Sequence, residues 1–226
     1  MIGAVLFDVD GTLIDSNDLH AAAWQEAFRA FGIEIPMGDI REQIGKGGDN
    51  LIPSLVPADT DRALHARIDS FRSDLFKRDY LPRVVPFPGV RALFERLLGD
   101  GLKIVLASSA KEEEVQFHLG IIGAADLVIA TTSADDVEHS KPCPDIFASA
   151  LQKVAPLTPE QVVVVGDSPF DVIAAKKLGM GVIGFRSGGF DDRVLLEAGA
   201  DQLFDGVEDL LARYESSLLC EREPVK

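Results

Sequence analysis

Aspartate residues follow two apolar segments that lie far apart in the sequence. Asp8 and Asp10 end the first segment, and Asp167 ends the second, with Asp171 four residues further on. If the fold gathers these four carboxylates, like charges about 4 Å apart repel by several kcal/mol at an intermediate dielectric. Such a group either keeps protons or holds a cation. Carboxylate oxygens without nearby His or Cys suit Mg²⁺, which also takes water and phosphate oxygens as ligands.

Hydroxyl and ammonium donors stand at comparable positions. Ser108 and Ser109 follow a third apolar segment, and Lys141 precedes Pro142 in a later loop. Ser108 and Lys141 could donate to the oxygens of a phosphate group. Carboxylates, one divalent cation and one ammonium together describe phosphoryl transfer through a carboxylate nucleophile.

The segments that carry these residues alternate with helical patterns. Short apolar runs bounded by turn residues predict strands, and amphipathic runs between them predict helices. The predicted strands are 2–9, 102–107, 126–130, 161–165, 180–185 and 201–204, and the predicted helices are 90–98, 112–119, 145–154 and 170–178. This alternation predicts an α/β fold with a parallel sheet and helices on both faces. Because ligands bind at the carboxyl edge of such a sheet, all the residues above are expected at one rim.

Residues 16–86 interrupt the alternation. They show helical periodicity without a convincing strand, and about seventy residues are far longer than the usual connection of roughly 2 to 6 residues. We expect a small all-helical domain over 16–86, inserted after the first strand, and a core domain formed by 1–15 and 87–226. Residues 215–226 are polar and are expected to form a frayed tail.

Each motif also has a simpler interpretation. Asp10-Gly11 could be a turn, Ser108 could begin a helix, and Asp167-Ser168-Pro169 could be a helix cap. Lys141 alone could be a solvated side chain. The functional interpretation is favoured because all of them fall at the same sheet edge and are complementary in charge.

Taken in order, these residues resemble the four motifs of the haloacid dehalogenase (HAD) superfamily. The motifs are Asp8-Val9-Asp10-Gly11-Thr12, Ser108 at a strand end, Lys141-Pro142, and Gly166-Asp167-Ser168 with Asp171. The resemblance covers nearly the whole chain and implies a Rossmann-like core. The helical insert is similar to the cap domain of the phosphoglycolate phosphatase and β-phosphoglucomutase branch.

The resemblance implies a role for each residue. Asp8 would attack phosphorus to form an aspartyl-phosphate, and Asp10 would protonate the leaving oxygen and later deprotonate water. The Asp8 and Asp167 carboxylates and the Asp10 main-chain carbonyl would hold Mg²⁺, with Asp171 orienting water or Asp167. Ser108 and Lys141 would hold the transferring phosphoryl oxygens.

The insert is expected to select the substrate, with Ser109 contributing from the core. Its candidate residues are His20, near the first hinge, and Lys46, within the glycine-rich segment 45–48. Both resemble cap positions that touch substrate in sugar-phosphate members of the branch. His20 could instead be a half-buried helix residue, and Lys46 a solvated one.

Composition narrows the classes of partner. The 226 residues carry a formal charge of −15, which argues against binding a nucleic-acid backbone or an anionic membrane surface. Cys143 and Cys220 are too few for a disulfide framework. Residues 1–9 are apolar but too short to span a bilayer, carry no basic leader, and are followed by Asp10 before any small-residue cleavage site. We expect a cytoplasmic protein, a monomer or weak homodimer, that acts on a small phosphorylated metabolite.

Three functions stay open. The first is a Mg²⁺-dependent phosphatase of a small phosphomonoester such as a sugar phosphate. The second is a β-phosphoglucomutase-like mutase, weakened because no arginine adjoins Lys46, although Arg41 could substitute. The third is a noncatalytic phosphate-binding or interaction module, which would not need Asp8 and Asp10 together. The resemblance sets two relatives aside: a dehalogenase would not need the metal acids Asp10 and Asp167, and a phosphonate hydrolase is not expected to carry Asp at position 10.

Overall fold

A parallel sheet of six strands carries the predicted motifs. The computed structural model describes residues 1–220. From edge to edge the strands are β5 (Ala130–Thr132), β4 (Lys103–Ala107), β1 (Ala4–Phe7), β6 (Val162–Gly166), β7 (Gly181–Phe185) and β8 (Gln202–Phe204). In β1, Phe7 pairs with Leu106 of β4 and with Val165 of β6. The residues that follow these three strands therefore lie side by side at the carboxyl edge.

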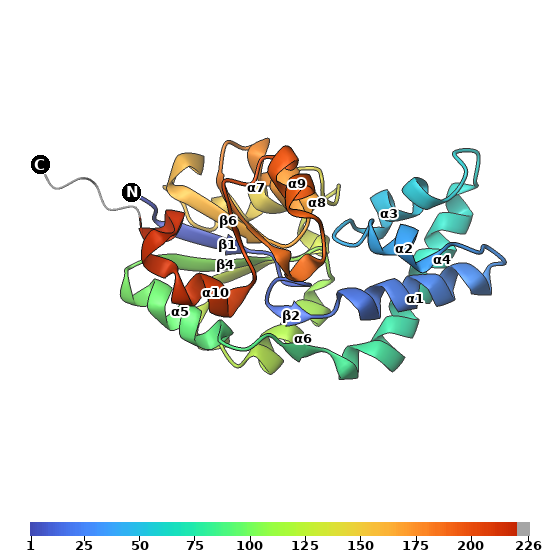
Figure 1. Ribbon diagram of the computed structural model, residues 1–226. Helices are drawn as coiled ribbons and strands as arrows, with labels where there is room; N and C mark the ends of the chain where they lie inside the picture. Colours follow the sequence, from blue (N-terminus) through green and yellow to red (C-terminus); the bar gives the residue numbers. More distant parts are fainter. Residues whose placement is uncertain (221–226) are drawn as a thin grey trace, which may run out of the picture.

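Helices cover both faces of this sheet (Figure 1). Strand side chains alternate between faces, and in β1 Val5 and Phe7 pack in one apolar cluster whereas Ala4 and Leu6 pack in another. The helices that add to the first cluster are α5 (Val90–Gly99), α6 (Glu112–Ile122) and α10 (Val207–Ala212). Those that add to the second are α7 (Asp145–Gln152), α8 (Pro169–Lys176) and α9 (Asp192–Ala198). The predicted α/β class, a parallel sheet between helical layers, is confirmed.

Four helices follow β1 and lie beyond the carboxyl edge of the sheet (Figure 1). They are α1 (Asn17–Ala30), α2 (Met37–Arg41), α3 (Gly48–Leu55) and α4 (Arg62–Leu75). Their apolar faces form a third cluster around Trp24, Phe28 and Ile68. A π-helical turn, Phe76–Tyr80, and a 3₁₀ turn, Leu81–Arg83, lead the chain back to the core.

The crossing between these helices and the core contains two short strands that the sequence does not predict. β2 (Ile14–Asp15) pairs with β3 (Val85–Pro86) in an antiparallel ladder. Each strand has two residues, too few for period-2 alternation to appear. The expectation of no strand in 16–86 is therefore wrong at its last residues, where pairing with Ile14 and Asp15 decides the structure.

Other differences concern boundaries. The strand predicted over 126–130 is a 3₁₀ turn, Ala125–Leu127, followed by β5. Asp126 belongs to the turn because both its carboxylate oxygens accept hydrogen bonds from Arg91 of α5, each at 3.0 Å. The expectation of a frayed tail is wrong for 215–220, where 3₁₀ turns bury Leu219 against the core. The remainder of that segment, 221–226, lies outside the described residues.

Candidate active site

Asp8 lies directly after the central strand and is almost fully buried. Its main-chain N–H donates to the carbonyl of Val165 at 2.9 Å, which fixes the end of β1 against β6. The Lys141 ammonium pairs with Asp8 Oδ1 and lies 2.7 Å from Asp171 Oδ1. Lys141 is only 1% exposed. A single buried ammonium therefore sits between two carboxylates.

The second aspartate of this group is Asp167, at the end of β6. Asn17 Nδ2 donates to Asp167 Oδ2 at 2.7 Å. Thr12 Oγ1 lies 3.2 Å from Asp8 Oδ2 and 3.3 Å from Asp167 Oδ1. We call Asp8, Asp167, Asp171 and Lys141 the acidic floor. The structure thus brings together four residues that the sequence places on three distant segments.

Charge in the acidic floor is not balanced by the protein alone. Burial raises the pKa of Asp8 well above its usual range; Lys141 acts in the opposite direction, and the nearby Asp171 and Asp167 add to the rise. Burial, then Asp171, raises the pKa of Asp167 to about 7. Burial alone would lower the pKa of Lys141, but Asp171 and Asp8 outweigh it and raise that pKa. Three carboxylates against one ammonium leave room for a further positive charge.

The donor set fits a hard divalent cation. One carboxylate oxygen each from Asp8, Asp167 and Asp171 lies within 4.8 Å of the other two. Asn17 Oδ1 is buried without a hydrogen-bond partner among the described residues, so it could accept from a water on such an ion. Oxygen-only ligands at a water-accessible cavity are the environment that Mg²⁺ prefers.

Asp171 is less free to be a ligand than its neighbours. Its Oδ2 accepts from the main-chain N–H of Ser168 at 3.1 Å and from Ser168 Oγ at 2.6 Å, which caps α8. Its Oδ1 faces Lys141. Asp171 thereby holds the lysine in place beside Asp8, in accord with a supporting position next to the ligands.

Asp10 points away from the acidic floor. The chain turns at Gly11, between Asp10 and β2. The φ angle of Gly11 is +75°, and a Cβ at this position would lie only 2.1 Å from Asp167 Oδ2, so a side chain would not fit there. Asp10 Oδ1 accepts from Ser16 Oγ at 2.7 Å and lies 2.9 Å from His20 Nε2. Burial would raise the pKa of Asp10, but the contact with His20 and the hydrogen bond from Ser16 hold it well below its usual range.

His20 belongs to α1 and is held on all sides. Its ring stacks on Phe76, with centroids 4.0 Å apart. The Arg72 guanidinium contacts His20 Nδ1, and because arginine can only donate, Nδ1 is the acceptor and Nε2 carries the hydrogen given to Asp10. Burial lowers the pKa of His20, in accord with this neutral tautomer.

Ser108 and Ser109 lie at the end of β4, as the sequence predicts. Ser108 is buried; its N–H donates to the carbonyl of Thr132 at 2.9 Å, and its Oγ accepts from the N–H of Ala110 at 3.0 Å. Ser109 lines the cavity described next. The end of β4 therefore presents one anchored and one accessible hydroxyl.

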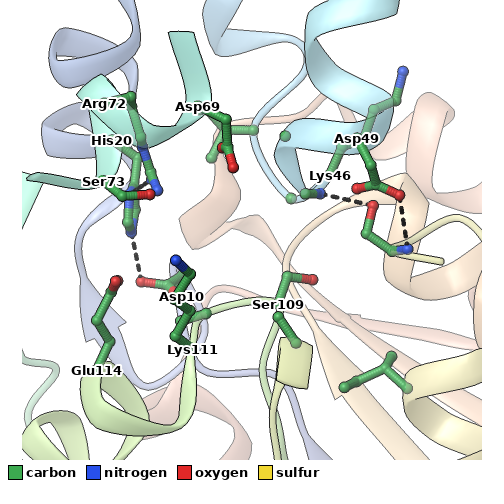
Figure 2. Close-up of a pocket in the computed structure, with 18 of the residues that line it drawn as sticks. Asp10, His20, Lys46, Asp49, Asp69, Arg72, Ser73, Ser109, Lys111 and Glu114 are labelled. Atoms are coloured by element: carbon green, nitrogen blue, oxygen red, sulfur yellow. Dashed lines mark hydrogen bonds and ion pairs between the residues drawn. The ribbon is translucent and has the colours of Figure 1, made fainter. Parts of the chain in front are cut away.

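A cavity of about 270 Å³ opens between the sheet edge and the helices α1–α4 (Figure 2). Asp8 and Asp10 line its base, and Asp69, Arg72 and Ser73 of α4 line it from the opposite side. Glu114 of α6 lines it from the core. We call the part bounded by Asp69, Arg72, Ser73 and Glu114 the upper chamber.

The sequence analysis did not single out the residues of the upper chamber. A signal was available, because Asp69, Arg72 and Ser73 recur at i, i+3 and i+4 and so share one face of a helix. Asn17, which holds Asp167, gave no such signal, since an Asn one residue after Ser16 is most simply a helix start.

Lys46 lines the cavity, but its ammonium is engaged by the helical insert itself. Lys46 Nζ donates to Gln43 Oε1 at 2.6 Å and to Ser54 Oγ at 2.9 Å, and it lies 4.7 Å from the Phe170 ring centroid. Partial burial lowers its pKa. Of the two residues of the insert that were predicted to contact substrate, His20 therefore faces Asp10 directly, whereas Lys46 mainly forms part of the cavity wall.

Comparison with known proteins defines the family. The model of the haloacid dehalogenase-like hydrolases matches residues 5–185, and the chain belongs to this family. It is 30% identical over 194 residues to the fructose-1-phosphate phosphatase YqaB of Escherichia coli, covering 80% of this chain and 95% of that protein. The crystal structure of a hydrolase from Pseudomonas syringae superposes with a TM-score of 0.88 at 29% identity, covering 95% and 98% of the two chains. The predicted class, a HAD-like phosphatase, is confirmed.

A further relative is much longer. Protein SUPPRESSOR OF QUENCHING 1, chloroplastic, of Arabidopsis thaliana is 28% identical over 216 residues, which cover 92% of this chain but 20% of that protein. Within residues 1–220, no helix combines the length and the apolar character needed to cross a membrane.

Proposed function

We propose that the protein is a Mg²⁺-dependent phosphatase that hydrolyses a small phosphomonoester, such as a sugar phosphate, through an aspartyl-phosphate on Asp8. The observation that carries the proposal is the position of Asp8 at the base of the cavity, between Lys141 and the oxygens of Asp167. A carboxylate in that position can attack phosphorus while cations on either side shield the incoming phosphoryl charge.

Mg²⁺, when bound, would neutralise part of the charge between the nucleophile and the phosphoryl oxygens. The Asp8 and Asp167 carboxylates and the Asp10 main-chain carbonyl would hold it, and Asp171 would keep Lys141 beside Asp8. Ser108 and Lys141 would donate to the phosphoryl oxygens. The buried, anchored positions of these groups support roles that demand little movement.

Two displacements complete the proposed reaction. In the first, Asp8 Oδ bonds to phosphorus, the bond from phosphorus to the leaving oxygen breaks, and Asp10 gives that oxygen a proton. In the second, Asp10 takes a proton from water, the water oxygen bonds to phosphorus, and the Asp8 carboxylate and inorganic phosphate are released. His20 and Ser16 hold the pKa of Asp10 low; a phosphoryl dianion beside it would raise that pKa by like charge, so that substrate entry would prepare Asp10 as an acid.

The helical segment 16–86 is proposed as a cap domain on a core formed by 1–15 and 87–226. Its own apolar cluster and the two-residue ladder at its base support this division. A cap closing over the cavity would exclude bulk water from the first displacement. His20 would then orient Asp10, and Ser109 would contact the substrate at the cavity rim.

The mutase alternative needs a second cationic grip for a bisphosphate. Lys46 is bound by Gln43 and Ser54, and Arg41 is paired with Asp18 at 2.9 Å. These partners leave neither cation free toward the cavity, which favours the phosphatase. A noncatalytic module is disfavoured because it would not need Lys141 buried between Asp8 and Asp171.

Phosphate release tests the proposal. The protein is assayed on sugar phosphates, phosphoglycolate and an aryl phosphate, with Mg²⁺ and with chelator, and Asp8→Asn serves as the blank. Metal-dependent release from at least one compound, absent in the blank, is expected. No release by folded protein would reject the phosphatase, and the mutase would then be tested with β-glucose 1-phosphate and a bisphosphate primer.

A further inference from the structure

The upper chamber holds carboxylates that the protein itself does not pair. Glu114 is only 3% exposed, yet no hydrogen bond or ion pair joins its carboxylate to another residue within 1–220. Figure 2 shows its carboxylate reaching from α6 toward His20, Arg72 and Ser73, across the space above Asp10. Asp69 lines the same space from α4 and likewise has no hydrogen-bonding side-chain partner in the described part of the chain.

An unpaired buried carboxylate costs free energy unless something donates to it. Burial raises the pKa of Glu114, although Arg72 nearby acts in the opposite direction. A hydroxyl group entering the cavity would supply the missing hydrogen bond without adding charge. The Glu114 position thus has the properties of a ligand contact rather than of a packed core residue.

The cations around the cavity balance these acids only in part, because Arg72 is a single positive charge that faces both Glu114 and Asp69. The Arg72 guanidinium contacts His20 and lies 5.0 Å from both the Trp24 and the Phe76 rings, and the Lys46 ammonium is bound within the cap. Lys111 is exposed at the rim. Arg72 Nε is buried without a hydrogen-bond partner among the described residues, so the upper chamber offers one free donor beside two carboxylates. Two carboxylates against one guanidinium leave the upper chamber net negative, and an additional negative charge on the ligand would be disfavoured.

We propose that Glu114 determines substrate specificity: together with Asp69, it accepts hydrogen bonds from hydroxyl groups of a neutral, polyhydroxylated leaving group. The enzyme would select sugar or polyol phosphates over phosphomonoesters whose leaving group carries a carboxylate or a second phosphate. This inference rests on the proposed phosphatase function and assigns residues to the other end of its substrate.

The position of Glu114 in the chain supports this assignment. It lies in the first turn of α6, six residues after Ser108, which would bind the transferring phosphoryl group. A leaving oxygen next to Asp10 would direct the remainder of the substrate toward Glu114 on the core side and Asp69 on the cap side. Because the two acidic contacts lie on opposite walls, the closed position of the cap would be stabilised only when a hydroxylated group lies between them.

The test compares three substrates in the wild-type enzyme and in Glu114→Gln. The substrates are a hexose phosphate, an aryl phosphate without leaving-group hydroxyls, and phosphoglycolate, all with Mg²⁺. Glu112→Gln is the matched control, because it removes the same charge from the same turn, where the carboxylate accepts only from Gln116 at 2.6 Å. Thermal melts check folding, and Asp69→Asn provides a second variant from the opposite wall.

Glu114→Gln is expected to lower kcat/KM for the hexose phosphate by about 10- to 100-fold, the usual effect of losing hydrogen bonds to a charged group. The change should fall mainly on KM. Activity on the aryl phosphate should stay within about 2-fold, activity on phosphoglycolate should rise because a like charge is gone, and Glu112→Gln should resemble the wild type. Asp69→Asn should likewise lower the activity on the hexose phosphate relative to the activities on the aryl phosphate and on phosphoglycolate.

Two results would overturn the inference while the phosphatase stands. One is an equal loss on the hexose and aryl phosphates, which would make Glu114 a residue of the common chemistry. The other is an unchanged ratio of hexose phosphate to phosphoglycolate in both folded variants. A wild-type enzyme inactive on every substrate would instead reject the proposed function, and the aryl phosphate, which has no hydroxyl groups for the upper chamber to bind, separates these cases.

Discussion

In the acidic floor each charged side chain contacts a residue from a distant segment, whereas in the upper chamber two carboxylates contact no partner within residues 1–220. Lys141 joins the loop after β5 to Asp8 of β1 and Asp171 of α8, and Asn17 of α1 holds Asp167. Glu114 and Asp69 line the cavity, and no hydrogen bond joins their carboxylates to another described residue. If the proposed function holds, the groups that would act on every substrate are fixed by the fold, and the groups that would meet the variable part of a substrate have no hydrogen-bond partner among the described residues.

The first turns of α1 connect the two regions. Asn17 and His20 are three residues apart and so share a face of the helix. Asn17 donates to Asp167 in the floor, and His20 contacts both Asp10 and Arg72 of the chamber wall. A movement of α1 would therefore change the contact of Asn17 with Asp167 and the contact of His20 with Asp10 together.

Asp8→Asn is the change with the largest expected effect, because it removes the nucleophile from the floor and nothing from the chamber. Phosphate release should fall by at least about 10³-fold. The fold should persist, since burial and like charge already raise the pKa of Asp8 and the neutral amide relieves that repulsion. Melting temperature and phosphate release measure the two effects, and residual activity above a few percent would contradict the nucleophile assignment.

Lys141→Met tests whether partners in the floor are essential to the fold. Removing the ammonium leaves Asp8 and Asp171 buried without a counterion, and loss of one partner from a buried ion pair costs about 3–5 kcal/mol. Urea unfolding should show a loss of this size. The double variant Lys141→Met with Asp171→Asn should recover part of it, and additive losses in this cycle would mean that the ion pair carries no coupling energy.

Mg²⁺ should stabilise the folded protein through the floor alone. At a cation concentration 100 times the Kd, binding adds about 2.7 kcal/mol. The gain in melting temperature should be larger at pH 8 than at pH 6, because burial raises the pKa of Asp167 to about 7 and protons then compete with the cation as the pH falls. Asp167→Asn should abolish the gain and Glu114→Gln should preserve it; an equal gain in both variants would locate the cation elsewhere.

The sequence predicts the floor well because its residues follow strands. Once an alternating α/β pattern is accepted, parallel strands bring Asp8, Ser108 and Asp167 to one edge without any knowledge of side-chain packing. Lys141 lies on a loop, and its place beside Asp8 follows from charge complementarity rather than from periodicity. The positions of these residues, though not their roles, could thus be predicted from order and residue type.

The chamber could not be predicted in the same way. Arg72 meets His20 only because α4 packs against α1, and no local pattern reports how two helices of an insert cross. Glu114 follows two other glutamates in the sequence, and only the buried face of α6 distinguishes it from Glu113, which is exposed and paired with Lys77. Contacts between helices that are not adjacent in the sequence decide where these side chains lie. The periodicity of a single sequence carries no information about such contacts.

Lys46→Ala is expected to have the smallest effect on activity. It tests whether Lys46 only forms part of the cavity wall or also contacts the substrate. The Lys46 ammonium is bound to Gln43 and Ser54 and lies over Phe170, so its loss should cost about 1 kcal/mol of stability. Relative to wild type, kcat/KM should change by less than about 3-fold, and equally for a hexose phosphate and an aryl phosphate. A loss confined to the hexose phosphate would show that the lysine exchanges its cap partners for substrate, as the sequence resemblance implies. The cavity would then offer the substrate a second cation beside Arg72, and its preference for neutral leaving groups would have to be weaker than Glu114 and Asp69 alone suggest.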